Sequence, residues 1–126
     1  MVLKAITSDL VGMGTQVGLG SSDDAYIAAG VTVASTDSWA ITSSGDYQSV
    51  NVQGAVIGAK SALDLGSFNG QGQQLTIGEQ GYVGSTSKTV AAVVIQGGTA
   101  LVNNAGTIQG TSTASRFGAL RAAMRP

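Results

Sequence analysis

One glycine position recurs along the chain at nearly constant spacing, each time between two short segments of alternating apolar and polar residues. The recurring positions are 24, 27 and 25 residues apart, and they are Gly30, Gly54, Gly81 and Gly106. Alternation of this kind is typical of strands with one buried face. Self-similarity at a period of about 20 to 50 residues indicates a fold made of stacked units.

A third apolar run completes each period. The three runs are Trp39–Ile41, Leu63–Leu65 and Val93–Ile95. Three short strands and three turns in about 25 residues predict one coil of a parallel β-helix, with a strand on each of three faces. A single coil cannot bury its apolar face, so coils must stack. An antiparallel sandwich or barrel also has short strands, but it does not predict three strands in every period.

The composition agrees with this all-β prediction. Of 126 residues, 19 are glycine and one is proline, and only 10% are charged although 43% are hydrophobic. Long charged side chains do not fit a narrow coil interior, and proline would remove donors from the strand ladders. Glycine is expected where the chain turns sharply between faces, often with a positive φ.

The chain divides into three expected parts. Residues 1–20 form a cap or an irregular first coil, residues 21–113 form the coils, and residues 114–126 form a short amphipathic C-terminal helix. The apolar positions of this segment share one helical face and its basic positions supply half of the positive charge of the chain; these residues are Phe117, Leu120, Met124, Arg116, Arg121 and Arg125. The helix is expected to cap the coils or to mediate assembly. Binding to a membrane surface or to an anionic partner is the alternative.

Several functional classes are excluded by what the sequence lacks. There is no cysteine and no histidine, so a thiol nucleophile, a Ser-His-Asp triad and a zinc site of Cys or His ligands are excluded. A net charge of −1 gives no reason to expect nucleic-acid binding. No apolar stretch is long enough to span a membrane, and the first 20 residues are too interrupted by Asp9, Gly12 and Gly14 to form a secretory signal.

Three of the repeated segments resemble a known module. Asp24–Ser35, Val50–Gly58 and Leu101–Gly110 are similar to the β-helical region of bacterial secreted and surface proteins, such as RTX-type exoproteins, filamentous-haemagglutinin-like adhesins and autotransporter passengers. The resemblance covers roughly residues 20–112, and it implies an extracellular or cell-surface location, with a cytoplasmic one left open. The calcium-binding nonapeptide of the RTX-type proteins does not occur here, so their calcium role is not carried over.

The acidic residues offer weak candidates for a site. Asp23 and Asp24 form an adjacent pair beside two serines, which could begin a calcium site, although a turn or cap role is the simpler interpretation. No other cofactor is expected. Asp64 interrupts Leu63–Leu65 at the outward position of a strand, where a polar residue is the default. No catalytic residue is assigned.

Two further sets of side chains admit a structural and a binding interpretation. Asn51, Asn103 and Asn104 are expected to join side-chain ladders between coils. The aromatic residues could form a sugar-binding surface if they shared one face, but their different phases in the repeat favour packing at the core or rim. These residues are Tyr26, Trp39, Tyr47, Phe68 and Tyr82.

The sequence therefore predicts a non-enzymatic structural module. We expect homo-oligomers or filaments formed through the solenoid ends or a lateral face, because open strand edges recruit other chains. A carbohydrate- or surface-binding fragment of an adhesin is the alternative. A polysaccharide-active enzyme is a third hypothesis, and it requires two or more carboxylates in one groove.

Overall fold

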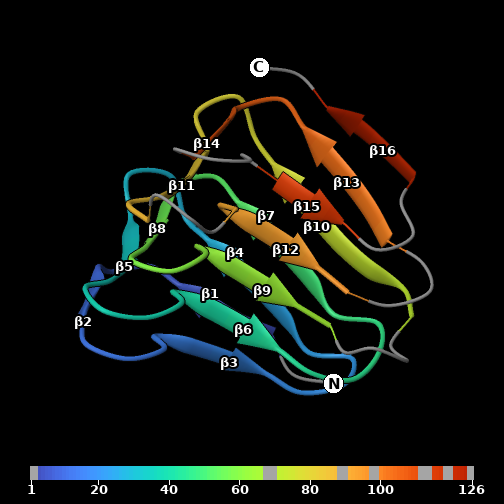
Figure 1. Ribbon diagram of the computed structural model, residues 1–126, viewed down its shortest axis with the longest axis horizontal. Coiled ribbons are helices and arrows are strands. Elements are labelled where there is room, and N and C mark those ends of the chain that lie inside the picture. The colour runs from blue at the N-terminus through green and yellow to red at the C-terminus, as the bar shows by residue number, and fades with distance from the viewer. Residues whose placement is uncertain are drawn as a thin grey trace.

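The computed structural model describes residues 3–66, 71–87, 91–96, 100–110, 115–117 and 121–124, and the regular secondary structure within them is entirely β-strand. The strands form three sheets (Figure 1). Sheet A has the order β1-β4-β7-β10-β13-β16, with strands Leu3–Ile6, Asp24–Ile27, Ser49–Val52, Gln73–Ile77, Ala100–Asn104 and Arg121–Met124.

The other two sheets have five strands each. Sheet B has the order β14-β11-β8-β5-β2, with strands Thr107–Gln109, Tyr82–Ser85, Ala55–Gly58, Thr32–Ser35 and Leu10–Gly12. Sheet C has the order β15-β12-β9-β6-β3, with strands Ser115–Phe117, Val93–Ile95, Leu63–Leu65, Ile41–Ser43 and Val17–Leu19.

The first five coils each contribute one strand to every sheet, β16 adds a sixth strand to sheet A, and the described strand pairs are parallel. The first coil comprises β1, β2 and β3, and the second comprises β4, β5 and β6. The parallel three-sheet solenoid predicted from the repeat is therefore confirmed, and an antiparallel sandwich or barrel is excluded. The chain begins at one end of the stack and finishes at the other (Figure 1).

The core consists of inward columns in which similar side chains lie above one another. One column of sheet A contains Ile27, Val52 and Ile77, which the register places in line. Sheet B contributes Val33, Val56 and Val83. All six side chains are at most 1% exposed. β-branched residues suit this arrangement because each side chain packs against its counterpart in the next coil.

One predicted strand begins two residues later than expected. The register pairs Ile41 with Leu63, so β6 is Ile41–Ser43 instead of Trp39–Ile41. Trp39 lies in the corner before β6, where the Lys60 ammonium sits 4.5 Å above its ring. An apolar run alone does not show whether its residues lie in a strand or in a corner, because apolar side chains can pack against the core from both places.

The four repeated glycines are required for two different reasons. Gly30 has a φ of 80°, and nothing lies within 4 Å of the place a Cβ would occupy. Gly54, Gly81 and Gly106 do not have a positive φ. A Cβ at each of these three would overlap carbonyl oxygens of the preceding coil. The expected positive φ is therefore correct for Gly30 and wrong for the other three, which are glycine because two coils approach closely.

Strands are described near both ends of the chain. Residues 3–19, expected to form a cap or an irregular coil, form strands that pair in register with the second coil. The predicted helix over 114–126 lies in part outside the described residues. The stretches of it that are described, β15 and β16, have extended backbone paired with β12 and β13. No helix in the described part of the chain is long and apolar enough to cross a membrane.

Candidate functional site

The outer face of sheet B is the most unusual surface of the solenoid. None of its five strands contains a charged residue. One outward column contains Val11, Ala34, Ile57, Gly84 and Gln109, which the register places in line along the stack. Outward side chains of a solvated sheet are polar by default. The first four positions of this column are apolar or lack a side chain.

A second outward column runs beside the first and is also built from small or uncharged residues. It contains Thr32, Ala55, Tyr82 and Thr107. The Tyr82 ring lies over Gly84, where a Cβ would come within 2.6 Å of the phenol oxygen. The Tyr82 hydroxyl donates a hydrogen bond of 3.3 Å to Gln109 Oε1 in the next coil. The ring thus covers the glycine and keeps this part of the face flat.

A carboxylate at the border of sheet B is already used within the fold. Asp9 lies just before β2, and its Oδ1 accepts a hydrogen bond of 2.9 Å from the Thr32 amide in the second coil. Two other aspartates join neighbouring coils in the same way. Asp37 Oδ1 accepts from the Gly14 amide at 2.7 Å, and Asp46 Oδ1 accepts from the Gln71 amide at 2.9 Å. These carboxylates serve as turn caps between coils.

The weak calcium candidates do not form a cluster of ligands. Asp23 Oδ2 accepts from the Gly20 amide at 2.9 Å, which is a turn contact, whereas Asp24 occupies an outward position of β4. Among the described residues, no three acidic side chains gather where they could hold a metal ion. The described contact of Asp23 fits the turn role, and the calcium site stays a prediction.

The carboxyl group of Asp64 lies in an environment that shifts its pKa. It points outward from β9, between Thr42 and Val94 of the adjacent strands. Partial burial disfavours the charged form and raises the pKa of Asp64 above its ordinary value. The flanking side chains, Thr42 and Val94, carry no charge that would oppose this rise in pKa. Neither of these two register partners supplies the second carboxyl that a polysaccharide-active enzyme would need.

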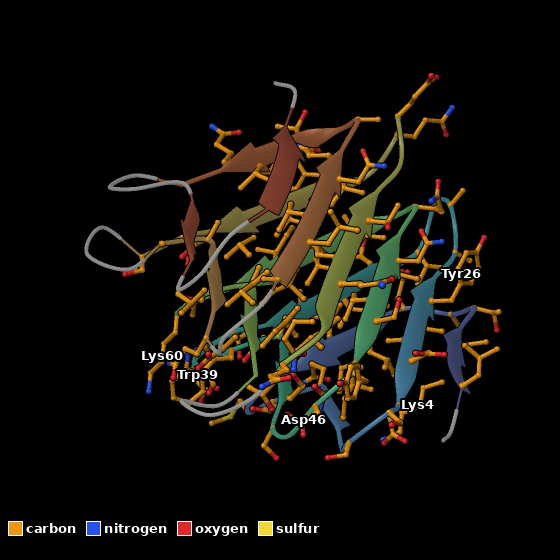
Figure 2. All side chains as sticks on the ribbon, turned by 90° about the vertical axis from the view of Figure 1, so that its right-hand side faces the viewer. Lys4, Tyr26, Trp39, Asp46 and Lys60 are labelled. Atoms are coloured by element: carbon orange, nitrogen blue, oxygen red, sulfur yellow. The ribbon has the colours of Figure 1, made fainter. Side chains whose placement is uncertain are left out.

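The aromatic side chains lie on different parts of the surface. Tyr26 points outward from sheet A, Tyr82 from sheet B, and Trp39 and Tyr47 lie in two different corners. Tyr26 lies far from the adjacent pair of Trp39 and Lys60 (Figure 2). Phe68 lies outside the described residues. The described aromatic residues therefore do not form one continuous stacking surface.

The asparagines expected to form a ladder are not neighbours. The register places Thr76 between Asn51 and Asn103. Asn51 Oδ1 accepts from Gln53 Nε2 at 2.6 Å, and the buried Asn104 Oδ1 accepts from the Gly106 amide at 2.9 Å. These two hydrogen bonds lie within single coils, and the register does not place Asn51 directly against Asn103.

A buried pair of glutamines was not expected from the sequence. Gln48 lies just before β7 and Gln73 is the first residue of β10, and each precedes one of the paired residues Ser49 and Gln74. Their side chains are 1% and 0% exposed. Gln48 Nε2 donates to the carbonyls of Gly20 and Ser44, and Gln73 Nε2 donates to the Gly45 carbonyl. Their shared spacing of 25 residues was the available signal, but nothing in the local pattern identifies either glutamine as buried.

The structure places four of the six C-terminal candidate residues in strands and does not describe their side chains. Arg116 and Phe117 lie in β15, and Arg121 and Met124 lie in β16. Leu120 and Arg125 fall outside the described residues. The assembly or capping role expected for these six residues stays a prediction.

Comparisons with protein-family models, with curated proteins and with solved structures each find no match to this chain. The parallel β-solenoid architecture is shown by the strand order itself. The specific resemblance to secreted exoproteins and adhesins gains no support from these comparisons.

Proposed function

We propose that this chain is a non-enzymatic structural module that associates with further copies of itself through the outer face of sheet B. The observation that carries the proposal is the uncharged, small and largely apolar set of outward residues on β2, β5, β8 and β11. Two such faces can approach without burying a charge or a long flexible side chain. An exposed apolar patch that deviates from the usual polar surface indicates an interaction site.

The dimensions of the face determine how strong this association can be. Five strands at about 4.8 Å and four residues at about 3.3 Å give a face of roughly 19 by 13 Å. That is about 250 Å² per copy, well below the roughly 800 Å² per partner of a stable interface. A pair of copies therefore associates weakly, with a Kd on the order of a millimolar, and strong association requires many such contacts in one assembly.

The biological setting of the module belongs to the same proposal. A bacterial surface or secreted assembly is supported by the similarity of Asp24–Ser35 and Leu101–Gly110 to β-helical segments of such proteins. The absence of histidine and cysteine from the sequence supports a role without catalysis, as does the use of described carboxylates as turn caps.

Sedimentation velocity over a range of concentrations up to about one millimolar tests the association. We expect the natural chain to form dimers or larger species as its concentration rises. Ile57→Lys places a charge at the centre of the face and is expected to abolish them. Thr76→Lys adds the same charge at an outward, exposed position of sheet A and is the matched control.

A natural chain that stays monomeric at the highest concentration would overturn the proposed self-association. Equal association by the Ile57→Lys and Thr76→Lys proteins would overturn the assignment to sheet B. Negative-stain microscopy of concentrated samples provides the second measurement, since ordered assemblies of stacked modules should be visible only where the face is intact.

A further inference from the structure

Among the described strands, none pairs with the outer edges of the first coil. β1, β2 and β3 are the terminal strands of sheets A, B and C. The Val17 amide bonds to the Ala40 carbonyl, and the Leu19 carbonyl accepts from the Ser44 amide. Because carbonyls alternate in direction along a strand, the Gly18 carbonyl between them points away from the second coil and toward the open edge.

Lys4 is the side chain that reaches this open carbonyl. The Lys4 Nζ donates a hydrogen bond of 2.6 Å to the Gly18 carbonyl oxygen. The register aligns Lys4 with Ala25 and then Val50, which occupy an inward column of the core. Lys4 is thus a charged residue at a core-facing position of the first coil. Its side chain extends from β1 of sheet A to β3 of sheet C.

From this geometry we infer that Lys4 closes the N-terminal end of the solenoid against a second copy of the chain. A coil stacked below the first would need the Gly18 carbonyl as an acceptor and would bury the Lys4 ammonium against an apolar layer. Burying an ammonium without a charged partner is strongly unfavourable. Inward-pointing charges are one of the means by which proteins protect open sheet edges.

The partner that this end excludes is another N-terminal end, joined through a two-fold axis. The rim of the first coil carries large exposed apolar side chains, with Leu3, Val11 and Met13 being 65%, 62% and 79% exposed. Two such rims match each other, as an isologous contact requires. The two Lys4 ammonium groups would meet near the axis in that arrangement, so repulsion adds to the cost of burial. The inference concerns an end of the solenoid, whereas the contact proposed for sheet B concerns a lateral face, and Val11 borders both surfaces.

The test replaces Lys4 by methionine, which keeps the length of the side chain and removes its charge. The variant is made in the Ile57→Lys background, so the contact proposed for sheet B contributes nothing to the result. We expect Lys4→Met to form a dimer with an association constant at least about tenfold above that of the background protein. Lys60→Met is the matched control, because the same charge is lost from a lysine that lies over Trp39.

Two measurements distinguish this dimer from other products. Small-angle X-ray scattering should show a particle close to twice as long as the monomer. The amide NMR signals of Ala5, Val11 and Gly18 should shift with concentration, because these residues lie on the open edges of β1, β2 and β3. Lys4→Gln should dimerise as well, and Lys4→Arg should behave as the background protein does.

The inference is overturned if Lys4→Met and Lys4→Gln sediment as the background protein does. It is also overturned if they form open filaments, or if the concentration-dependent shifts lie outside the first coil. If circular dichroism shows that the Lys4→Met protein does not fold, the Lys4→Gln protein provides the test. Its uncharged polar side chain can still donate a hydrogen bond to the Gly18 carbonyl.

Discussion

Tyr47 and Gly72 occupy the same left-handed corner of successive coils, and the Tyr47 ring lies against the backbone of Gly72. Their φ angles are 59° and 72°, and the equivalent residue of the second coil, Ser22, has a φ of 62°. A Cβ at Gly72 would overlap the Tyr47 ring. This corner therefore repeats as a backbone conformation, although only one of its three residues is glycine.

The corner leads to a prediction for Gly72→Ala. We expect a loss of about 1 to 3 kcal/mol in the free energy of unfolding, because alanine is strained at positive φ and its methyl group displaces the Tyr47 ring. Urea unfolding followed by circular dichroism measures it. Gly18→Ala is the control, since open space surrounds Gly18 and its φ is not positive, and it should change stability by less than about 0.5 kcal/mol.

Gly30 and Gly54 should respond differently to the same substitutions. Gly30→Ala should cost about 1 kcal/mol through backbone strain alone, and Gly30→Asn should cost less because asparagine tolerates the left-handed region. Gly54→Ala should cost roughly 2 to 3 kcal/mol, since its Cβ overlaps the Ala28 and Val31 carbonyl oxygens. Equal unfolding midpoints for Gly54→Ala and Gly30→Ala would contradict this distinction.

Gln73→Glu should destabilise the solenoid in a pH-dependent manner. The carboxylate would be fully buried and would face the Gly45 carbonyl, which now accepts from Gln73 Nε2. We expect a loss of about 2 to 4 kcal/mol at pH 7, which diminishes on acidification because a protonated glutamic acid can donate to that carbonyl. Gln74→Glu, at the exposed neighbouring position of β10, should have little effect at either pH.

Asp64 should make the solenoid less stable as the pH rises through the acidic range. Burial raises the pKa of Asp64 in the folded state above the ordinary value of 3.8. At pH values between 3.8 and this raised pKa, the folded protein binds more protons than the unfolded chain. Stability then falls as pH increases across that window. The stability difference between Asp64→Asn and the natural chain should favour asparagine more at pH 7 than at pH 3. Urea midpoints that keep a constant difference across this range would show that Asp64 does not titrate abnormally.

The architecture could be predicted because the signals that specify it are local and repeated. Alternation of apolar and polar residues in segments such as Leu63–Leu65 determines which side chains point inward, and the period determines that the same pattern returns once per coil. Trp39 shows the limit of this reasoning, because an apolar residue in a corner has the same local appearance as one in a strand.

The candidate surface could be predicted only in general terms. Self-association through an end or a lateral face was expected, but the choice of face depends on which strands share a sheet. Val11, Ala34 and Ile57 become neighbours only once the register between coils is fixed. Residue spacing alone misplaced the strand at β6 by two positions. That error assigns the corner residue Trp39 to the strand.

The sequence by itself determined the all-β class, the period, the three strands of each coil and the exclusion of chemistry that needs histidine or cysteine. Only the tertiary structure decided why the four repeated glycines are required, that Gln48 and Gln73 are buried, and that Lys4 reaches the Gly18 carbonyl. The physical reason is that inward and outward facing is a property of one strand, whereas close approach and hydrogen bonding between coils depend on residues about 25 positions apart. Gly30 and Gly54 look alike in the sequence, but Gly30 has a positive φ with open space around it, whereas Gly54 lies against carbonyl oxygens of the preceding coil.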